Sequence, residues 1–110
     1  MTFQHRGLAS GRWHALRFVE QMANIGSEVE RTIAWRAKGQ HEISRRAFER
    51  ALELIDLTVS DSKNRRRLRE LLRVRELLAD HFICGNDFQT TPESWQHYFR
   101  FFLNAARGNR

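Results

Sequence analysis

The chain has 110 residues, 41% of them hydrophobic, and a formal net charge of +6 at pH 7. This length predicts a single domain over residues 1–110, and the apolar content excludes a wholly disordered chain. No apolar run approaches the roughly 18 residues that a membrane-spanning helix needs, and we expect no secretory signal. The single cysteine, Cys84, cannot form an internal disulfide, so we expect a cytoplasmic protein.

The first predicted helix runs from about Arg12 to Lys38, after a short N-terminal arm at residues 1–11. Gly39 is expected to end it. Small and apolar residues recur on one face at helical spacing: Ala15, Leu16, Val19, Met22, Ala23, Gly26, Val29, Ile33 and Ala37. Glu30 falls inside this stripe, whereas Trp35 points to the opposite side.

The second predicted helix runs from about Glu42 to Ser60. Its inward face comprises Ile43, Ala47, Phe48, Ala51, Leu54, Ile55, Thr58 and Val59. The third begins near Asp61 or Ser62, either of which can cap it, and ends at Gly85. Its apolar stripe comprises Leu68, Leu71, Leu72, Leu78, Ala79 and Phe82.

The fourth predicted helix starts in the segment TTPESW, with Thr91 as its cap and Pro92 in its first position. Its inward face comprises Trp95, Tyr98, Phe99, Phe102, Leu103 and Ala106, and residues 108–110 form a frayed tail. The connections of roughly three, three and seven residues favour antiparallel neighbours. The predicted fold class is therefore all-α, an up-down-up-down antiparallel four-helix bundle.

Arg75 interrupts the apolar stripe of the third helix. A lone buried guanidinium is costly, so it needs a carboxylate, and Glu30 of the first helix is the candidate. We therefore predict a buried Glu30–Arg75 ion pair that fixes the register of the helices. Two alternatives stay open: a polar site in the core that uses this pair, or an Arg75 that extends out to solvent.

Basic residues crowd the start of the third helix, where the helix dipole is already positive. Because such crowding favours a polyanion as partner, we predict nucleic-acid binding, RNA in preference to DNA, by Lys63, Arg65, Arg66, Arg67, Arg69 and Arg73. Arg45, Arg46 and Arg50 are expected to extend this patch. The alternatives are an acidic protein partner, or a solvated face with Arg66–Glu70 and Arg73–Glu76 pairs.

Arg75 and His81 have an R-x5-H spacing, which resembles the signature of the helical HEPN ribonucleases. That resemblance implies joint action on an RNA phosphate at a dimer interface, whereas the ordinary alternative is a histidine packed at the edge of the core. His81 with Cys84 is half a metal site at most. We therefore expect no catalytic residue, no metal and no cofactor, and an enzyme is the less favoured class.

Trp35 is expected to be exposed, which predicts a self-association surface and a homo-oligomer. Its burial under the N-terminal arm or a loop is the alternative. A protein-interaction adaptor that uses Trp35 is the second function considered.

The segments GRWHALRFVEQMANIGSEVERTIAW (residues 11–35) and RALELIDLTV (residues 50–59) resemble a family of small uncharacterised bacterial proteins. In its architecture the whole chain is similar to the Avd-like bundles. These include the accessory determinant of diversity-generating retroelements and proteins encoded in intervening sequences of 23S ribosomal RNA genes. The resemblance implies a small, basic, oligomeric accessory protein that associates with nucleic acid. It carries over no functional residue.

Overall fold

The computed structural model describes residues 8–108, and every element in that range is helical. The elements are α1 (Leu8–Ala15), α2 (Phe18–Ala37), α3 (His41–Ser60), the 3-10 helix η1 (Ser62–Arg67), α4 (Leu68–Phe82) and α5 (Pro92–Gly108). The predicted all-α class is confirmed. Of the predicted arm and tail, residues 1–7 and 109–110 lie outside the described residues, residues 8–11 belong to α1, and Gly108 ends α5.

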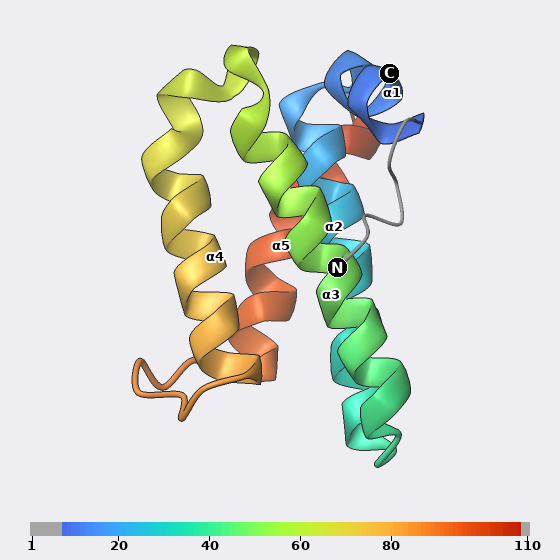
Figure 1. Ribbon diagram of the computed structural model, residues 1–110, viewed down its shortest axis with the longest axis vertical. Coiled ribbons are helices and arrows are strands. Elements are labelled where there is room, and N and C mark those ends of the chain that lie inside the picture. The colour runs from blue at the N-terminus through green and yellow to red at the C-terminus, as the bar shows by residue number, and fades with distance from the viewer. Residues whose placement is uncertain (1–7, 109–110) are drawn as a thin grey trace.

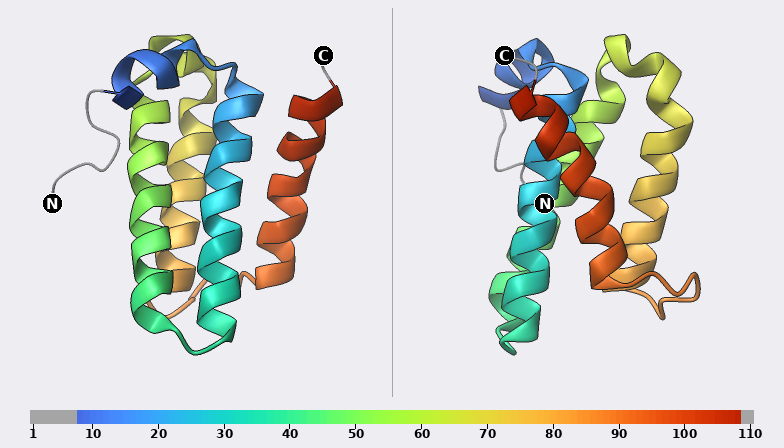
Figure 2. Two further views of the ribbon diagram at one scale, coloured as in Figure 1. Left: turned by 90° about the vertical axis from the view of Figure 1, so that its right-hand side faces the viewer. Right: turned by 180° about the vertical axis from the view of Figure 1, so that it is seen from behind.

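The four long helices lie side by side, with α1 across one end of the molecule (Figure 1). Figure 2 shows α2 between α3 and α5, and these two pairs form the main helix contacts, while α4 packs beside α3. Gly39 ends α2 with a φ of 77°, and the Gln40 N–H donates to the Trp35 carbonyl over 3.0 Å. The expected stop at Gly39 is therefore confirmed.

The core combines aliphatic side chains of α2, α3 and α4 with aromatic side chains of α5. Its largest fully buried apolar members are Met22, Ile25, Val29, Ile55, Leu71 and Leu78. α5 adds Trp95, Phe99 and Phe102. A Cβ on Gly26 would lie 2.7 Å from the Cβ of Phe99, so glycine at this position allows α2 and α5 to approach closely. No helix within residues 8–108 is long and apolar enough to cross a membrane.

The predicted first helix is wrong at its start, because α1 and α2 are separate helices joined by a turn. Trp13 of α1 is buried, and its indole N–H donates to Thr58 Oγ1 over 2.9 Å, which holds α1 against α3. α2 then begins anew, with the Arg17 N–H donating to Glu20 Oε1 over 2.9 Å. Side-chain contacts over a long sequence distance set this break, and hydrophobic periodicity does not report them.

The predicted third helix is wrong in its first turns, which form the 3-10 helix η1. The phase of the buried face also differs, since Leu71, Val74 and Leu78 are buried whereas Leu68 and Leu72 are exposed. Spacings of three and four residues connect the buried set, as expected for one helix face. Leu68 and Leu72 therefore form part of a second, solvent-facing apolar surface.

The predicted Glu30–Arg75 pair is wrong. Arg75 pairs with Asp56 of α3, with Nε donating to Oδ1 over 2.8 Å and Nη2 to Oδ2 over 3.4 Å. Glu30 is exposed and accepts a hydrogen bond of 3.0 Å from the Gln96 amide of α5. The reason is that Met22 and Ile25 mark the inward face of α2, so Glu30 lies at its edge beside α5.

Candidate nucleic-acid interface

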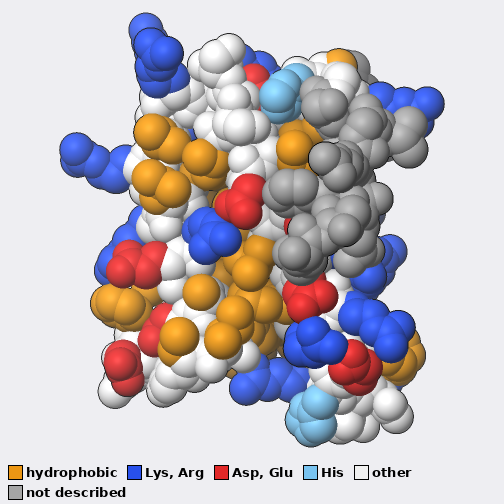
Figure 3. Space-filling model, in the orientation of Figure 1, with side chains coloured by type: hydrophobic (Ala, Val, Ile, Leu, Met, Phe, Trp, Pro, Cys, Tyr) orange, Lys and Arg blue, Asp and Glu red, His pale blue; other side chains and the backbone are white. Residues whose placement is uncertain are grey.

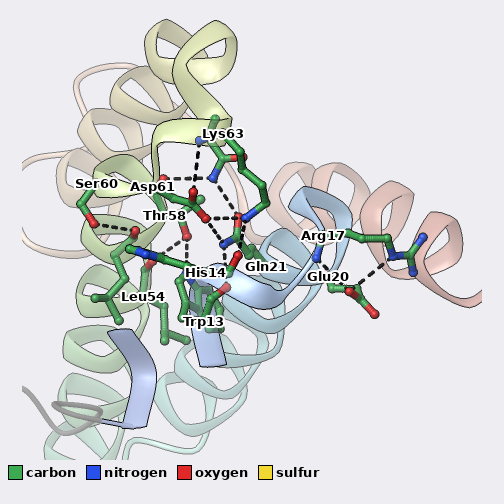
Figure 4. A network of polar contacts seen from close by, with 12 residues as sticks. Trp13, His14, Arg17, Glu20, Gln21, Leu54, Thr58, Ser60, Asp61 and Lys63 are labelled. Atoms are coloured by element: carbon green, nitrogen blue, oxygen red, sulfur yellow. Dashed lines mark hydrogen bonds and ion pairs between the residues drawn. The ribbon is translucent and has the colours of Figure 1, made fainter. Parts of the chain in front are cut away.

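Asp61 fixes the start of η1. Its Oδ1 accepts a hydrogen bond of 3.1 Å from the Lys63 N–H, which confirms the predicted cap. The Lys63 ammonium forms an ion pair with Asp61 Oδ2 and donates to the His14 carbonyl of α1 over 3.1 Å. Figure 4 shows these contacts converging from α1, α3 and η1. Lys63 is therefore engaged within the fold.

Gln21 of α2 is the buried centre of this network (Figure 4). Its Nε2 donates to the Trp13 carbonyl over 2.9 Å and to Asp61 Oδ2 over 3.0 Å. Its Oε1 accepts a hydrogen bond of 2.8 Å from Asn64 Nδ2, which also donates to the Thr58 carbonyl over 3.1 Å. Because satisfied buried polar networks specify one arrangement, Gln21 holds η1 rigidly against the rest of the fold.

The network also controls the charge of Asp61. Burial opposes ionisation of this carboxyl, but hydrogen bonds from Lys63 and Gln21 outweigh burial and hold the pKa of Asp61 below its usual value. Asp61 is therefore ionised at neutral pH. Its negative charge balances Lys63 and not the arginines that follow.

Arg67 and Arg73 each have an acidic partner and an aromatic partner. Arg67 lies 3.5 Å from Glu70, and its guanidinium carbon lies 4.9 Å from the ring centre of Phe18. Arg73 lies 3.1 Å from Glu76 and covers the Phe88 ring at 4.9 Å. The predicted Arg73–Glu76 pair is thus confirmed. The predicted Arg66–Glu70 pair is wrong, because Glu70 lies beside Arg67.

Arg65, Arg66 and Arg69, which we call the arginine trio, differ from the other basic residues of this segment. All three are exposed, and none makes an ion pair or side-chain hydrogen bond within residues 8–108. Lys and Arg side chains project from the upper left of the molecule, over η1 and the start of α4 (Figure 3). The dipole of α4 adds positive potential at the same place. The result is a fixed, uncompensated cationic surface.

Arg45, Arg46 and Arg50, which we call the α3 cluster, do not extend this surface. They lie in the first half of α3, at the end of the molecule remote from η1 (Figure 1). Each also has a carboxylate within 4 Å, supplied by Glu42, Glu49 or Glu28. The predicted extension of the patch is therefore wrong.

Arg75 and His81 have separate structural partners. Arg75 is held by Asp56 of α3, whereas His81 Nδ1 lies 2.9 Å from Thr90 Oγ1 in the loop before α5. The His81 ring also packs edge-on against Phe82, with ring centres 4.5 Å apart. Residues 8–108 contain no group of three or more His, Cys, Asp or Glu side chains placed to hold a metal ion.

Trp35 is half-buried, and the Lys38 ammonium lies 5.0 Å from the centre of its ring. Lys38 therefore covers part of the aromatic surface that the sequence assigned to self-association. A role for Trp35 in an oligomer stays a prediction.

The sequence did not predict the role of Gln21 and Asn64, the polar residues that anchor η1. The available signal was an amide on the inward face of α2, next to Met22, which requires a buried polar partner. No family model, curated protein or solved structure matches the chain. The resemblance to Avd-like bundles stays a prediction.

Proposed function

We propose that this protein is an up-down-up-down antiparallel helical bundle that binds nucleic acid without catalysing a reaction, with RNA as the preferred partner. The observation that supports this proposal is the arginine trio, three exposed guanidinium groups without an acidic partner in the described part of the chain. Guanidinium groups make forked contacts with phosphate, and release of counterions from the polyanion drives such binding.

The rigid anchoring of η1 also favours binding. The trio begins on η1, which the buried Gln21 and Asn64 hold in place, so little backbone entropy is lost when the arginines meet a phosphate backbone. We assign the primary contacts to Arg65, Arg66 and Arg69. Arg67 and Arg73 contribute less because each must give up a carboxylate to reach phosphate. Lys63 is left out of the contact set because Asp61 and His14 hold it.

The test is a salt series of binding to a structured RNA and to duplex DNA, using nuclease-treated protein. Three phosphate contacts predict that log K falls against log salt with a slope of about −2 to −3. The triple variant Arg65→Ala, Arg66→Ala, Arg69→Ala should lose most of that slope and at least about tenfold in affinity at low salt. Tighter binding of the RNA than of the DNA would support the preferred partner.

The matched control removes the same charge elsewhere, through Arg45→Ala, Arg46→Ala and Arg100→Ala on α3 and α5. All three of these arginines are exposed. The control should keep the salt slope of the wild type, since its arginines lie outside the proposed contact set. Equal losses in the two triple variants would mean that net charge alone drives binding, and would refute the assignment to the trio.

A further inference from the structure

One exposed face of α4 carries a regular stripe that the nucleic-acid proposal does not use. Its members, the α4 stripe, recur at spacings of three, four and one residues: Leu68, Leu72, Arg75, Glu76 and Ala79 of α4, and Ile83, which caps the end of that helix. Arg75 and Ala79 are half-buried and the others are exposed. Leu68 is 38% exposed, Leu72 48% and Ile83 64%, which is unusual for aliphatic side chains. Figure 3 shows hydrophobic side chains along this face, with acidic and basic side chains between them.

The stripe is symmetric about its own centre. Leu68 and Ile83 are equally far from the midpoint between Arg75 and Glu76, and so are Leu72 and Ala79. If a second α4 ran antiparallel about a two-fold axis at that midpoint, each residue would face its counterpart. Leu68 would then meet isoleucine, Leu72 would meet a small alanine, and Arg75 would meet a carboxylate. Two-fold interfaces require this self-complementarity.

We propose that a second copy of this chain docks on the α4 stripe and forms a two-fold dimer with antiparallel α4 helices. Arg75 is already oriented by Asp56 through Nε and Nη2, while Nη1 makes no hydrogen bond within the described residues. That nitrogen is available to donate to Oε2 of the partner's Glu76, because Arg73 engages Oε1 and Oε2 makes no hydrogen bond within the described residues. The axis repeats the ion pair, so each dimer holds two of them at the centre of an apolar interface.

Two other apolar surfaces of the described chain lack such symmetry. The groove between α4 and α5, with a volume of about 340 Å³, is lined by Val74, Leu77, Trp95 and Tyr98 among others, and nothing in the structure shows what covers it. Phe101 is 66% exposed on α5 but has no self-complementary charge pattern around it. Among these surfaces, the α4 stripe is the one whose sequence itself specifies its partner.

The expected affinity follows from the size of the interface. α4 has 15 residues and is therefore about 22 Å long, which is short for an interface of standard size. We expect a dissociation constant on the order of micromolar. Sedimentation of nuclease-treated protein from sub-micromolar to millimolar concentrations should show a monomer that becomes a dimer. A monomer throughout this range would overturn the proposal, whatever the result for nucleic acid.

Leu72→Asp tests the apolar part of the stripe. Because the axis places the change in the interface twice, we expect the dissociation constant to rise at least about 100-fold. Leu72 is exposed, so the helix content by circular dichroism should be unchanged. Phe101→Asp is the matched control, an exposed apolar residue outside the stripe, and it should still dimerise as the wild type does. Equal effects of both changes would contradict the α4 interface.

Glu76→Lys tests the ion pair. It places two cations opposite Arg75 across the axis, and we expect the dissociation constant to rise at least about tenfold. Glu93→Lys makes the same charge change at an exposed position of α5 and should leave dimerisation unchanged. Equal weakening of the dimer in both variants would mean that added positive charge alone repels, and would refute the ion pair. An unchanged dissociation constant for Glu76→Lys would refute it as well.

The orientation of the helices can be read from Cys84, which is exposed and is the sole cysteine of the chain. It lies just beyond α4, so antiparallel helices place the two copies about 25 Å apart along the helix axis. Double electron-electron resonance between spin labels on the two copies of Cys84 should report a distance of that order. Labels in near contact, or ready formation of a Cys84 disulfide between copies, would indicate parallel helices and overturn the antiparallel arrangement.

Discussion

The α3 cluster and the arginine trio are equally rich in arginine but differ in their surroundings. Arg45 lies between Glu42 and Glu49 on one helix face, and Arg50 is 3.3 Å from Glu28 of α2. The trio has no carboxylate partner within the described residues. Arginine density alone therefore does not distinguish a solvated face from a binding face.

The difference arises from the placement of acidic residues. On α3, glutamates stand three or four positions from Arg45, where helix geometry brings opposite charges together. Around η1, Asp61 is taken by Lys63, and Glu70 lies beside Arg67. These two carboxylates thus pair with Lys63 and Arg67 and not with an arginine of the trio. A polyanion gains most where cations have no such partner to give up.

The largest effect is expected from removing the anchor of the trio with Gln21→Leu. The change removes the three buried hydrogen bonds that Gln21 makes to Asn64, Asp61 and the Trp13 carbonyl, so the free energy of unfolding should fall by about 3 kcal/mol. η1 should also lose protection against hydrogen exchange before α3 does. Denaturant unfolding and exchange measurements test this. Gln96→Leu is the control, since Gln96 bonds Glu30 near the surface and its loss should have little effect.

An unaltered stability of Gln21→Leu would mean that η1 does not depend on the buried network. The network would then not be what holds the trio in a fixed position. Neither Gln21→Leu nor Gln96→Leu should alter the hydrogen-exchange protection of the α3 cluster, because the cluster is part of a continuous helix.

A smaller effect is expected from acid, through Asp61. Its pKa is below the usual value in the folded state, so its contribution to stability is present above about pH 4. As the pH falls through the folded pKa, the carboxyl takes up a proton and this contribution is lost. Asp61→Asn should lower the free energy of unfolding by about 1 kcal/mol at neutral pH and flatten its acid dependence. A parallel pH profile for the two proteins would contradict this assignment.

The helical class, the caps at Asp61 and Thr91 and the stop at Gly39 could be predicted, because each depends on residues close in sequence. The Thr91 cap is seen in the Ser94 N–H, which donates to Thr91 Oγ1 over 3.0 Å. The break between α1 and α2 could not be predicted, since it depends on Trp13 reaching Thr58. The partner of Arg75 was missed for the same reason: the rotation of each helix is set by packing.

The candidate site was predicted in part. The sequence identified the basic residues of η1 and α4 but not which of them pair with a carboxylate or an aromatic ring. Those pairs depend on where the fold places Asp61, Glu70 and the aromatic rings. Helical spacing on a continuous helix predicts pairs such as Arg73–Glu76 correctly. It fails for Arg66–Glu70, because residues 62–67 wind as a 3-10 helix with three residues per turn.

The comparison between the two arginine groups can be reversed by design. Glu42→Gln with Glu49→Gln removes both partners of Arg45 without adding a cation to the chain. It also removes Glu42 from Arg46, which lies 3.9 Å from it and has no other ion pair within residues 8–108. If unpaired arginines are what nucleic acid selects, this double variant should bind structured RNA about threefold more tightly at low salt, with a steeper salt slope. Glu93→Gln with Asp87→Asn is the control, because it makes the same charge change at exposed positions away from both groups. The same gain in both double variants would mean that total charge governs binding and that pairing does not matter. A gain confined to the α3 variant would show that carboxylate partners prevent the α3 cluster from binding nucleic acid. The absence of such partners would then be what makes the trio a binding surface.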